Sequence, residues 1–181
     1  MDADDVSVPD RIEKQVHEFQ SDNHLAALGG QIEEFANNDP NNVVSRREMP
    51  LETAEIAKFA RRRSPINNPT VMFRKEDVLS VGGYPELNRA EDYYLFAKMI
   101  AAKKEIRNLP DVLVKYRLSA DNTRRRKSWA HTKDMIHARN QIRKLGVSSW
   151  FDFIIMSLSY LALFIMPSSL AETLYKRILR K

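Results

Sequence analysis

Apolar positions recur along the chain with alternating helical and strand spacing, so the sequence predicts a mixed α/β architecture. Apolar residues three and four positions apart, such as Ile12, Val16 and Phe19, predict a helix at 9–21. Periodicity and terminal signals predict further helices at 51–62, 75–81, 90–103 and 123–145. Apolar runs bounded by turn residues predict strands at 25–35, 70–74 and 112–117. We expect the three strands in one sheet, with a bulge or a close backbone approach at Gly29-Gly30.

The carboxyl-terminal part of the chain has a different pattern. Residues 150–166 are almost entirely apolar, a length at the lower edge of the roughly 17–25 residues that span a bilayer. Beyond them, apolar residues share a helical face opposite four cations, Lys176, Arg177, Arg180 and Lys181. This combination is typical of an element that lies on a membrane surface, and a single membrane span is the alternative.

Charge is distributed unevenly along the 181 residues. The first 60 residues carry 13 acids and 5 bases, whereas the last 61 carry 4 acids and 12 bases. An acidic start suggests a cation site, and a basic end suggests phosphate groups, nucleic acid or an anionic membrane. The chain has no cysteine, which excludes disulfides, zinc–thiolate sites and a thiol nucleophile.

Two acidic motifs are candidates for chemistry. Asp2 and Asp4 alternate in Asp-Ala-Asp-Asp and offer oxygen ligands to a hard cation such as Mg²⁺ or Mn²⁺. Glu91 and Asp92 begin a predicted helix, where a carboxylate can act as a general base. Each motif also has a structural interpretation, because acids at a terminus or in a first helical turn are often solvated or capping groups.

A basic run provides a third candidate site. Arg124, Arg125 and Arg126 precede Lys127, and guanidinium groups pair well with phosphate groups. A solvated start of the helix at 123–145 explains the same run. The four histidines have no spacing typical of metal ligands.

Five blocks in order resemble the family 2 glycosyltransferases. They are Met-Asp-Ala-Asp-Asp with Val8–Val16, Asn68–Arg74, Gly82-Gly83-Tyr84, Ala90–Leu95 and Leu109–Arg117. The resemblance implies a GT-A (nucleotide-diphospho-sugar transferase) fold. It makes Asp2 and Asp4 the carboxylates of the DXD motif, which bind the metal and the donor, and Asp92 the catalytic base, supported by Glu91. It also makes Gly82, Gly83 and Tyr84 the loop that shapes the acceptor site.

The resemblance covers residues 1–127 and begins where the βα units that bind the nucleoside end in such enzymes. It therefore implies a partial GT-A catalytic domain at 1–127, a connecting helix at 128–148 and a membrane-associating tail at 149–181. Some relatives carry a histidine ligand after the Tyr-Arg strand, but Leu118 and Ser119 stand here. We expect Asp2 and Asp4 to meet Asp92 in one cleft.

The implied function is inverting transfer of a sugar from a nucleotide-sugar donor to a polysaccharide or lipid-linked acceptor. Mg²⁺ or Mn²⁺ is the implied cofactor, and the inner face of the cell membrane is the implied location. A non-catalytic remnant, or a membrane-bound subunit whose partner chain supplies the nucleotide-binding half, is the first alternative. A metal-dependent nuclease or phosphotransferase is the second, although Gly82-Gly83-Tyr84 has no role in it.

Overall fold

The computed structural model of the protein describes residues 1, 3–118 and 128–166. A mixed sheet of five strands forms its centre. β5 (Glu105–Arg117) runs parallel to the long strand β2 (Leu25–Phe35) along one side, and β4 (Met72–Phe73) and β3 (Val43–Arg47) pair antiparallel on the other. β1 (Val6–Ser7) pairs antiparallel with the outer edge of β5. The expectation that the three predicted strands share one sheet is confirmed.

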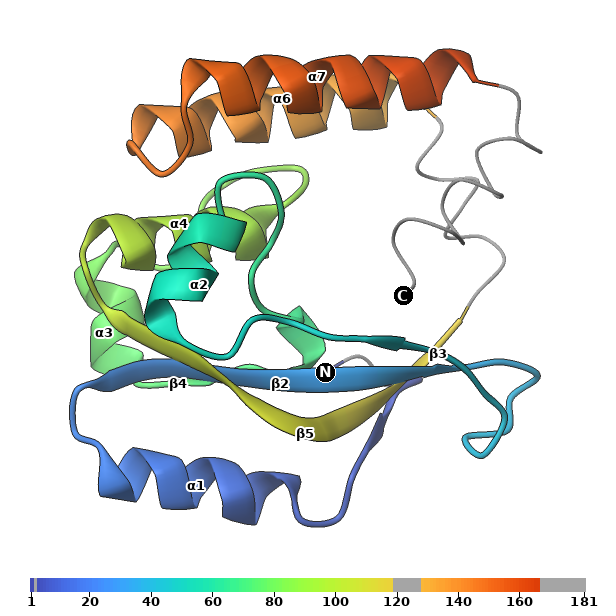
Figure 1. Ribbon diagram of the computed structural model, residues 1–181, viewed down its shortest axis with the longest axis vertical. Coiled ribbons are helices and arrows are strands. Elements are labelled where there is room, and N and C mark those ends of the chain that lie inside the picture. Colours follow the sequence, from blue (N-terminus) through green and yellow to red (C-terminus); the bar gives the residue numbers. More distant parts are fainter. Residues whose placement is uncertain (2, 119–127, 167–181) are drawn as a thin grey trace.

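Helices cover both faces of this sheet (Figure 1). α1 (Arg11–Ser21) lies against one face. The opposite face is covered by four short elements, α2 (Thr53–Phe59), the 3₁₀ helix η1 (Asn68–Thr70), α3 (Lys75–Ser80) and α4 (Glu91–Ala101). Beyond them, α6 (Trp129–Lys144) and α7 (Trp150–Ile165) form an antiparallel hairpin that makes a further layer. No helix in the described part of the chain is long and apolar enough to cross a membrane.

The main core lies between the sheet and α2 to α4. Leu95, Phe96 and Met99 of α4 are fully buried, as the helical pattern predicts, and they pack with Ile56 of α2 and Ile106 of β5. Removing these apolar side chains from water is the main force that fixes α4, and with it the residues at its start, on the sheet.

α1 packs with an unexpected face. Ile12 and Val16, whose spacing predicts the helix, are 56% and 39% exposed, whereas Arg11 and Gln15 are buried. The Gln15 amide donates hydrogen bonds of 2.9 Å to the carbonyls of Leu28 and Thr70. The helix is therefore confirmed, but a polar side chain rather than the apolar repeat ties it to β2 and η1.

The predicted bulge at Gly29-Gly30 is also confirmed. A Cβ on Gly29 would lie 2.3 Å from Oδ1 of Asn108, and the β2–β5 register shifts between Gly29 and Gln31. The Asn108 amide can therefore donate to the carbonyls of Pro50 and Pro65, at 2.7 and 3.0 Å. These two bonds hold the segments on both sides of α2 and so position the loop that follows that helix.

Candidate functional site

Asp92 lies in the first turn of α4 and is half-buried. Ala90 before the helix has a left-handed backbone, with φ of 58°, and one Asp92 oxygen accepts a 2.7 Å hydrogen bond from the amide of Tyr93. Burial raises the pKa of Asp92, and the nearby Glu91 charge also raises it, against the opposing effect of the Tyr93 amide. A carboxylate with raised proton affinity is suited to accept a proton in a reaction.

The loop Gly82–Tyr84 lies beside this carboxylate. Gly82 and Gly83 have positive φ angles of 81° and 62°, and Lys98 of α4 donates a 2.8 Å hydrogen bond to the Gly83 carbonyl. Burial and the charges of Asp92 and Glu91 raise the pKa of Tyr84, whose side chain is 48% exposed. The structure thus brings together the predicted base, its acidic neighbour and the predicted acceptor loop.

The amino-terminal acids are held at the end of β5. The guanidinium of Arg117 donates from Nε to the Asp4 carbonyl at 2.9 Å, and the Arg117 amide donates to the Asp5 carboxylate at 3.0 Å. Asp5 is buried and anchors the backbone, a role that the sequence analysis missed, whereas Asp4 is exposed. The exposed carboxylate of Asp4 offers the oxygen donor that Mg²⁺ or Mn²⁺ prefers.

Three of the predicted groups lie outside the described residues, namely Asp2, the run Arg124, Arg125 and Arg126, and the tail cations Lys176, Arg177, Arg180 and Lys181. Among the residues that are described, no three acidic or histidine side chains are close enough to hold a metal ion. The meeting of Asp2 and Asp4 with Asp92 in one cleft stays a prediction.

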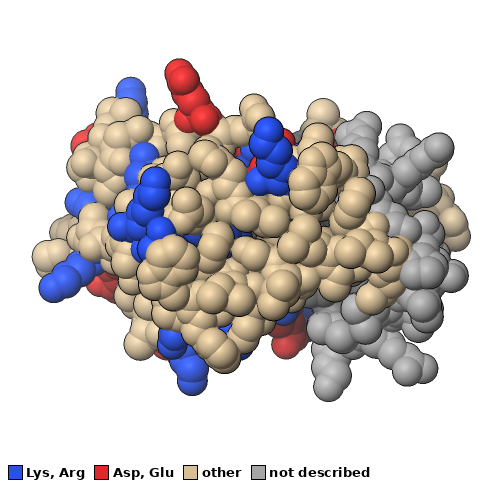
Figure 2. Space-filling model, turned by 90° about the horizontal axis from the view of Figure 1, so that it is seen from above, with Lys and Arg blue, Asp and Glu red and all other residues tan. Residues whose placement is uncertain are grey.

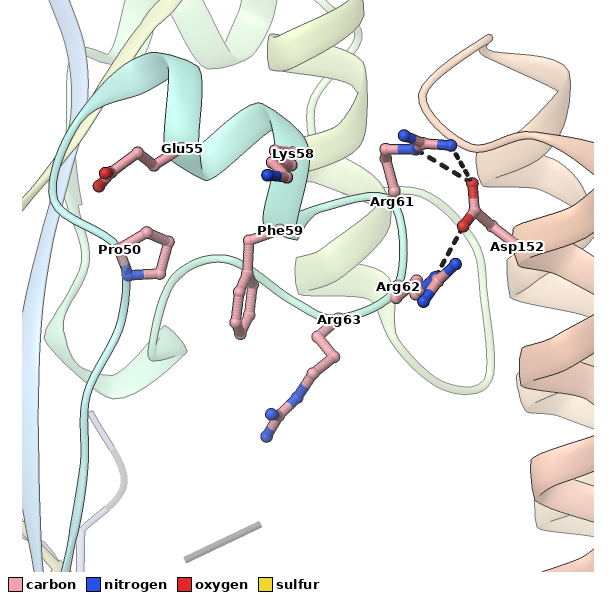
Figure 3. Close-up of a pocket in the computed structure, with 8 residues that line it drawn as sticks. All are labelled: Pro50, Glu55, Lys58, Phe59, Arg61, Arg62, Arg63 and Asp152. Atoms are coloured by element: carbon pink, nitrogen blue, oxygen red, sulfur yellow. Dashed lines mark hydrogen bonds and ion pairs between the residues drawn. The ribbon is translucent and has the colours of Figure 1, made fainter. Parts of the chain in front are cut away.

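A second cluster, which the sequence did not reveal, lies between α2 and α7 (Figure 3). It surrounds a pocket of about 690 Å³ lined by Pro50, Glu55, Lys58, Phe59, Arg61, Arg62, Arg63 and Asp152. Asp152 is 1% exposed, and its two oxygens accept from both arginines, at 3.0 and 2.8 Å from Arg61 and at 2.7 Å from Arg62.

Asp152 also caps α7. Its side chain accepts from the backbone and hydroxyl of Ser149, and the Ser149 hydroxyl accepts from the Asp152 amide at 3.1 Å. Burial acts to raise the pKa of Asp152, but the hydrogen bonds from Ser149, Arg62 and Arg61 outweigh it and hold the pKa well below the ordinary value. The charged form of Asp152 therefore fastens the α6–α7 hairpin to the loop that follows α2.

A buried polar contact joins the same hairpin to α4. The Tyr93 hydroxyl donates to the Ala60 carbonyl and accepts a 2.6 Å hydrogen bond from Arg139 of α6, which also donates to the Arg61 carbonyl at 3.3 Å. Arg139 is 2% exposed, and burial is the main cause that raises the pKa of Tyr93. The hairpin thus contacts the residue next to Asp92.

The fold and site define an α/β protein with a half-buried carboxylate beside a loop that contains two glycines, and comparison with known proteins identifies its class. No protein-family model matches the chain. An uncharacterized glycosyltransferase of Haemophilus influenzae is 38% identical over 185 residues, which cover all of this chain and 67% of the relative. The chain therefore belongs to the glycosyltransferases.

Two further relatives have more specific descriptions. The amylovoran biosynthesis glycosyltransferase AmsE of Erwinia amylovora is 30% identical, over 98% of this chain and 65% of its own length. The UDP-Gal:alpha-D-GlcNAc-diphosphoundecaprenol beta-1,3-galactosyltransferase of Escherichia coli is 29% identical, over 99% of this chain and 65% of its own length. The chain thus spans about two thirds of the length of these relatives.

Proposed function

We propose that the chain carries the acceptor side of an inverting family 2 glycosyltransferase that transfers a sugar from a nucleotide-sugar donor to a lipid-linked or glycan acceptor. The observation that carries this proposal is the half-buried Asp92 at the start of α4, beside Gly82–Tyr84. The description of the E. coli relative as acting on a sugar diphosphate lipid supports an acceptor of that kind.

In this mechanism Asp92 accepts the proton of the acceptor hydroxyl. As that proton leaves, the hydroxyl oxygen forms a bond to the anomeric carbon of the donor sugar, and the bond to the nucleoside diphosphate breaks on the opposite face. The raised pKa of Asp92 favours this proton transfer. Asp2 and Asp4 would bind Mg²⁺ or Mn²⁺, which supplies positive charge to stabilise the leaving diphosphate.

A transfer assay tests this function. The chain is combined with the third of the H. influenzae relative that it does not match. We expect this combination to transfer sugar from at least one member of a panel of nucleotide-sugars when Mn²⁺ is present. Transfer should cease when EDTA removes the metal. Asp4→Ala should raise the Mn²⁺ concentration needed for half-maximal donor binding by about tenfold or more, because one charged ligand is lost. Glu13→Ala, an exposed charge-matched change on α1, should leave this Mn²⁺ concentration unaltered. Metal-dependent cleavage of DNA without sugar transfer would instead establish the nuclease alternative.

We also propose that α7 lies on the cytoplasmic face of a membrane. Its outer side exposes a run of apolar residues, Trp150, Phe151, Ile154, Leu158, Phe164 and Ile165. Figure 2 looks down on the hairpin and shows a broad area without charged side chains, with Lys and Arg gathered toward the end where α7 begins. Such a combination is typical of helices that bind at the lipid interface.

Vesicle binding tests this location. The double variant Phe151→Asp/Ile154→Asp should lose about tenfold or more of its affinity for vesicles that contain phosphatidylglycerol, because two charges would enter the apolar interface. The matched variant Ile12→Asp/Val16→Asp changes two exposed apolar residues on the opposite side of the sheet and should bind as the unaltered chain does. Equal loss in both variants would count against an interface at α7.

A further inference from the structure

The pocket between α2 and α7 concentrates positive charge in a short stretch of chain. Four cations, Lys58, Arg61, Arg62 and Arg63, line it, against the acids Glu55 and Asp152. The side chains of Arg61 and Arg62 remain 49% exposed although Asp152 binds both. Positive charge therefore exceeds negative charge in a pocket that is open to solvent.

The two arginines are held in place in a way that suits an anion. A guanidinium has five N–H donors, and Asp152 receives two from Arg61 and one from Arg62. Because the buried carboxylate fixes these side chains, less conformational entropy is lost when a ligand binds to their exposed N–H groups. Figure 3 shows Arg63 and Phe59 extending to one side of this pair, where they line the same space. Guanidinium groups are well suited to bind phosphate oxygens.

An apolar surface lies on α7, the helix that supplies Asp152 to this pocket. Phe151 is adjacent to Asp152 in sequence, is 66% exposed and is followed along α7 by Ile154 and Leu158, which are 51% and 59% exposed. Arg143 lies 3.8 Å over the ring of Trp150 at the same end of the helix. A ligand with phosphates at one end and a long apolar chain at the other would complement both surfaces.

The pocket is also connected to the proposed base. Ala60, which precedes Arg61, accepts the hydrogen bond from the Tyr93 hydroxyl, and Tyr93 follows Asp92. A volume of about 690 Å³ is within the range of small-molecule sites and is larger than a single phosphate requires. The Tyr93 contact thus links the start of α4 to the segment that supplies Arg61 and Arg62 to the pocket.

We propose that this pocket binds the diphosphate group of an isoprenoid lipid, with the lipid chain along the exposed face of α7. This inference rests on the proposed function, because it assigns the place where a lipid-linked acceptor is held. The cations Lys58, Arg61, Arg62 and Arg63 neutralise the diphosphate, while the sugar attached to it extends toward α4. Asp4, one of the proposed metal carboxylates, is not among the residues that line the pocket.

Binding of farnesyl diphosphate tests the site directly. The two tryptophans of the chain, Trp129 and Trp150, both lie in the α6–α7 hairpin, so their fluorescence reports on ligands there. The titration is done in EDTA and without a donor, so that neither a metal site nor turnover contributes. We expect farnesyl diphosphate to bind at least about tenfold more tightly than either farnesol or inorganic pyrophosphate, because only the whole ligand contacts both surfaces.

The variants locate the binding. The double variant Lys58→Gln/Arg63→Gln should lower the affinity for farnesyl diphosphate about tenfold or more and leave the affinity for farnesol unchanged. The charge-matched variant Arg46→Gln/Lys75→Gln changes residues outside the pocket and should bind farnesyl diphosphate as the unaltered chain does. Lys58→Glu alone, an exposed change on α2, repeats the test if the double variant does not fold.

Several outcomes would overturn the site. They are unaltered farnesyl diphosphate binding in the pocket variants, equal affinity for farnesol, or equally strong competition by glycerol 3-phosphate, which would assign the pocket to ordinary phosphate head groups. Because no sugar is transferred in this titration, its failure leaves the proposed enzyme activity standing. Conversely, loss of transfer to every acceptor with intact binding would reject the activity and keep the site.

Discussion

Asp92→Asn is expected to reduce sugar transfer by about 10² to 10⁴-fold, the usual contribution of a general base. The change keeps the shape of the side chain and removes its ability to accept a proton. Donor binding should persist, because Asp2 and Asp4, not Asp92, are the proposed donor and metal carboxylates. The assay combines the chain with the unmatched part of its relative. Initial rates in this assay measure the loss of transfer, and donor affinity measures whether donor binding persists.

Glu76→Gln is the matched control for this variant. Glu76 is exposed and occupies the second position of α3, as Asp92 does in α4, so the charge change and the helix position are the same. It should retain its activity. Near-normal turnover of Asp92→Asn, or an equal loss in Glu76→Gln, would remove Asp92 from the mechanism.

The pH dependence of the unaltered enzyme provides an independent check. A base works in its deprotonated form, so kcat/KM should rise with pH through the pKa of Asp92 in the free enzyme. Because burial and Glu91 raise that pKa, the acidic limb should lie above 3.8, the ordinary value for an aspartate. A limb at or below 3.8 would contradict the assignment.

Elements with strong local patterns could be predicted from the sequence, and weakly patterned ones could not. The inward side chains of α4, Leu95, Phe96 and Met99, follow from helical spacing alone, because one face of that helix is fully buried. β3 was missed because it lies at the edge of the sheet, where Val43 and Val44 remain 43% and 50% exposed and leave no buried pattern. β1 was missed because a strand of two residues is too short to show periodicity.

The residues of the candidate sites also divide into those with a local sequence signal and those without one. Glu91, Asp92 and the glycine loop are close in sequence, so local signals and the family resemblance pointed to them together, while their roles stay predictions. The contacts of Arg61 and Arg62 with Asp152 join residues 91 and 90 positions apart, and no local pattern pairs them. One sequence signal could have identified Asp152: it is an acid within an apolar run and stands three residues after Ser149, which is the spacing of a capping box.

Asp152→Ala should lower the free energy of unfolding by about 2–4 kcal/mol. The variant loses the cap of α7 and the charged hydrogen bonds to Arg61 and Arg62. Its cost should lie at or below the lower part of the roughly 3–5 kcal/mol range typical of breaking a fully buried pair, because both arginines are half-exposed and regain water. Denaturant unfolding measures the difference, and Asp134→Ala on α6 serves as the control for loss of an acid from the hairpin.

The pH dependence of this difference distinguishes the charged contact from simple packing. The folded protein holds the pKa of Asp152 below its ordinary value of 3.8, so its electrostatic contribution is fully present above that pH. As pH falls from 3.8 toward the lower folded value, the carboxylate becomes protonated and the contribution is lost. The stability difference between the unaltered chain and Asp152→Ala should therefore be constant near neutral pH and shrink below 3.8. A difference that stayed constant to lower pH would show that the side chain stabilises the hairpin by packing and capping, not by its charge.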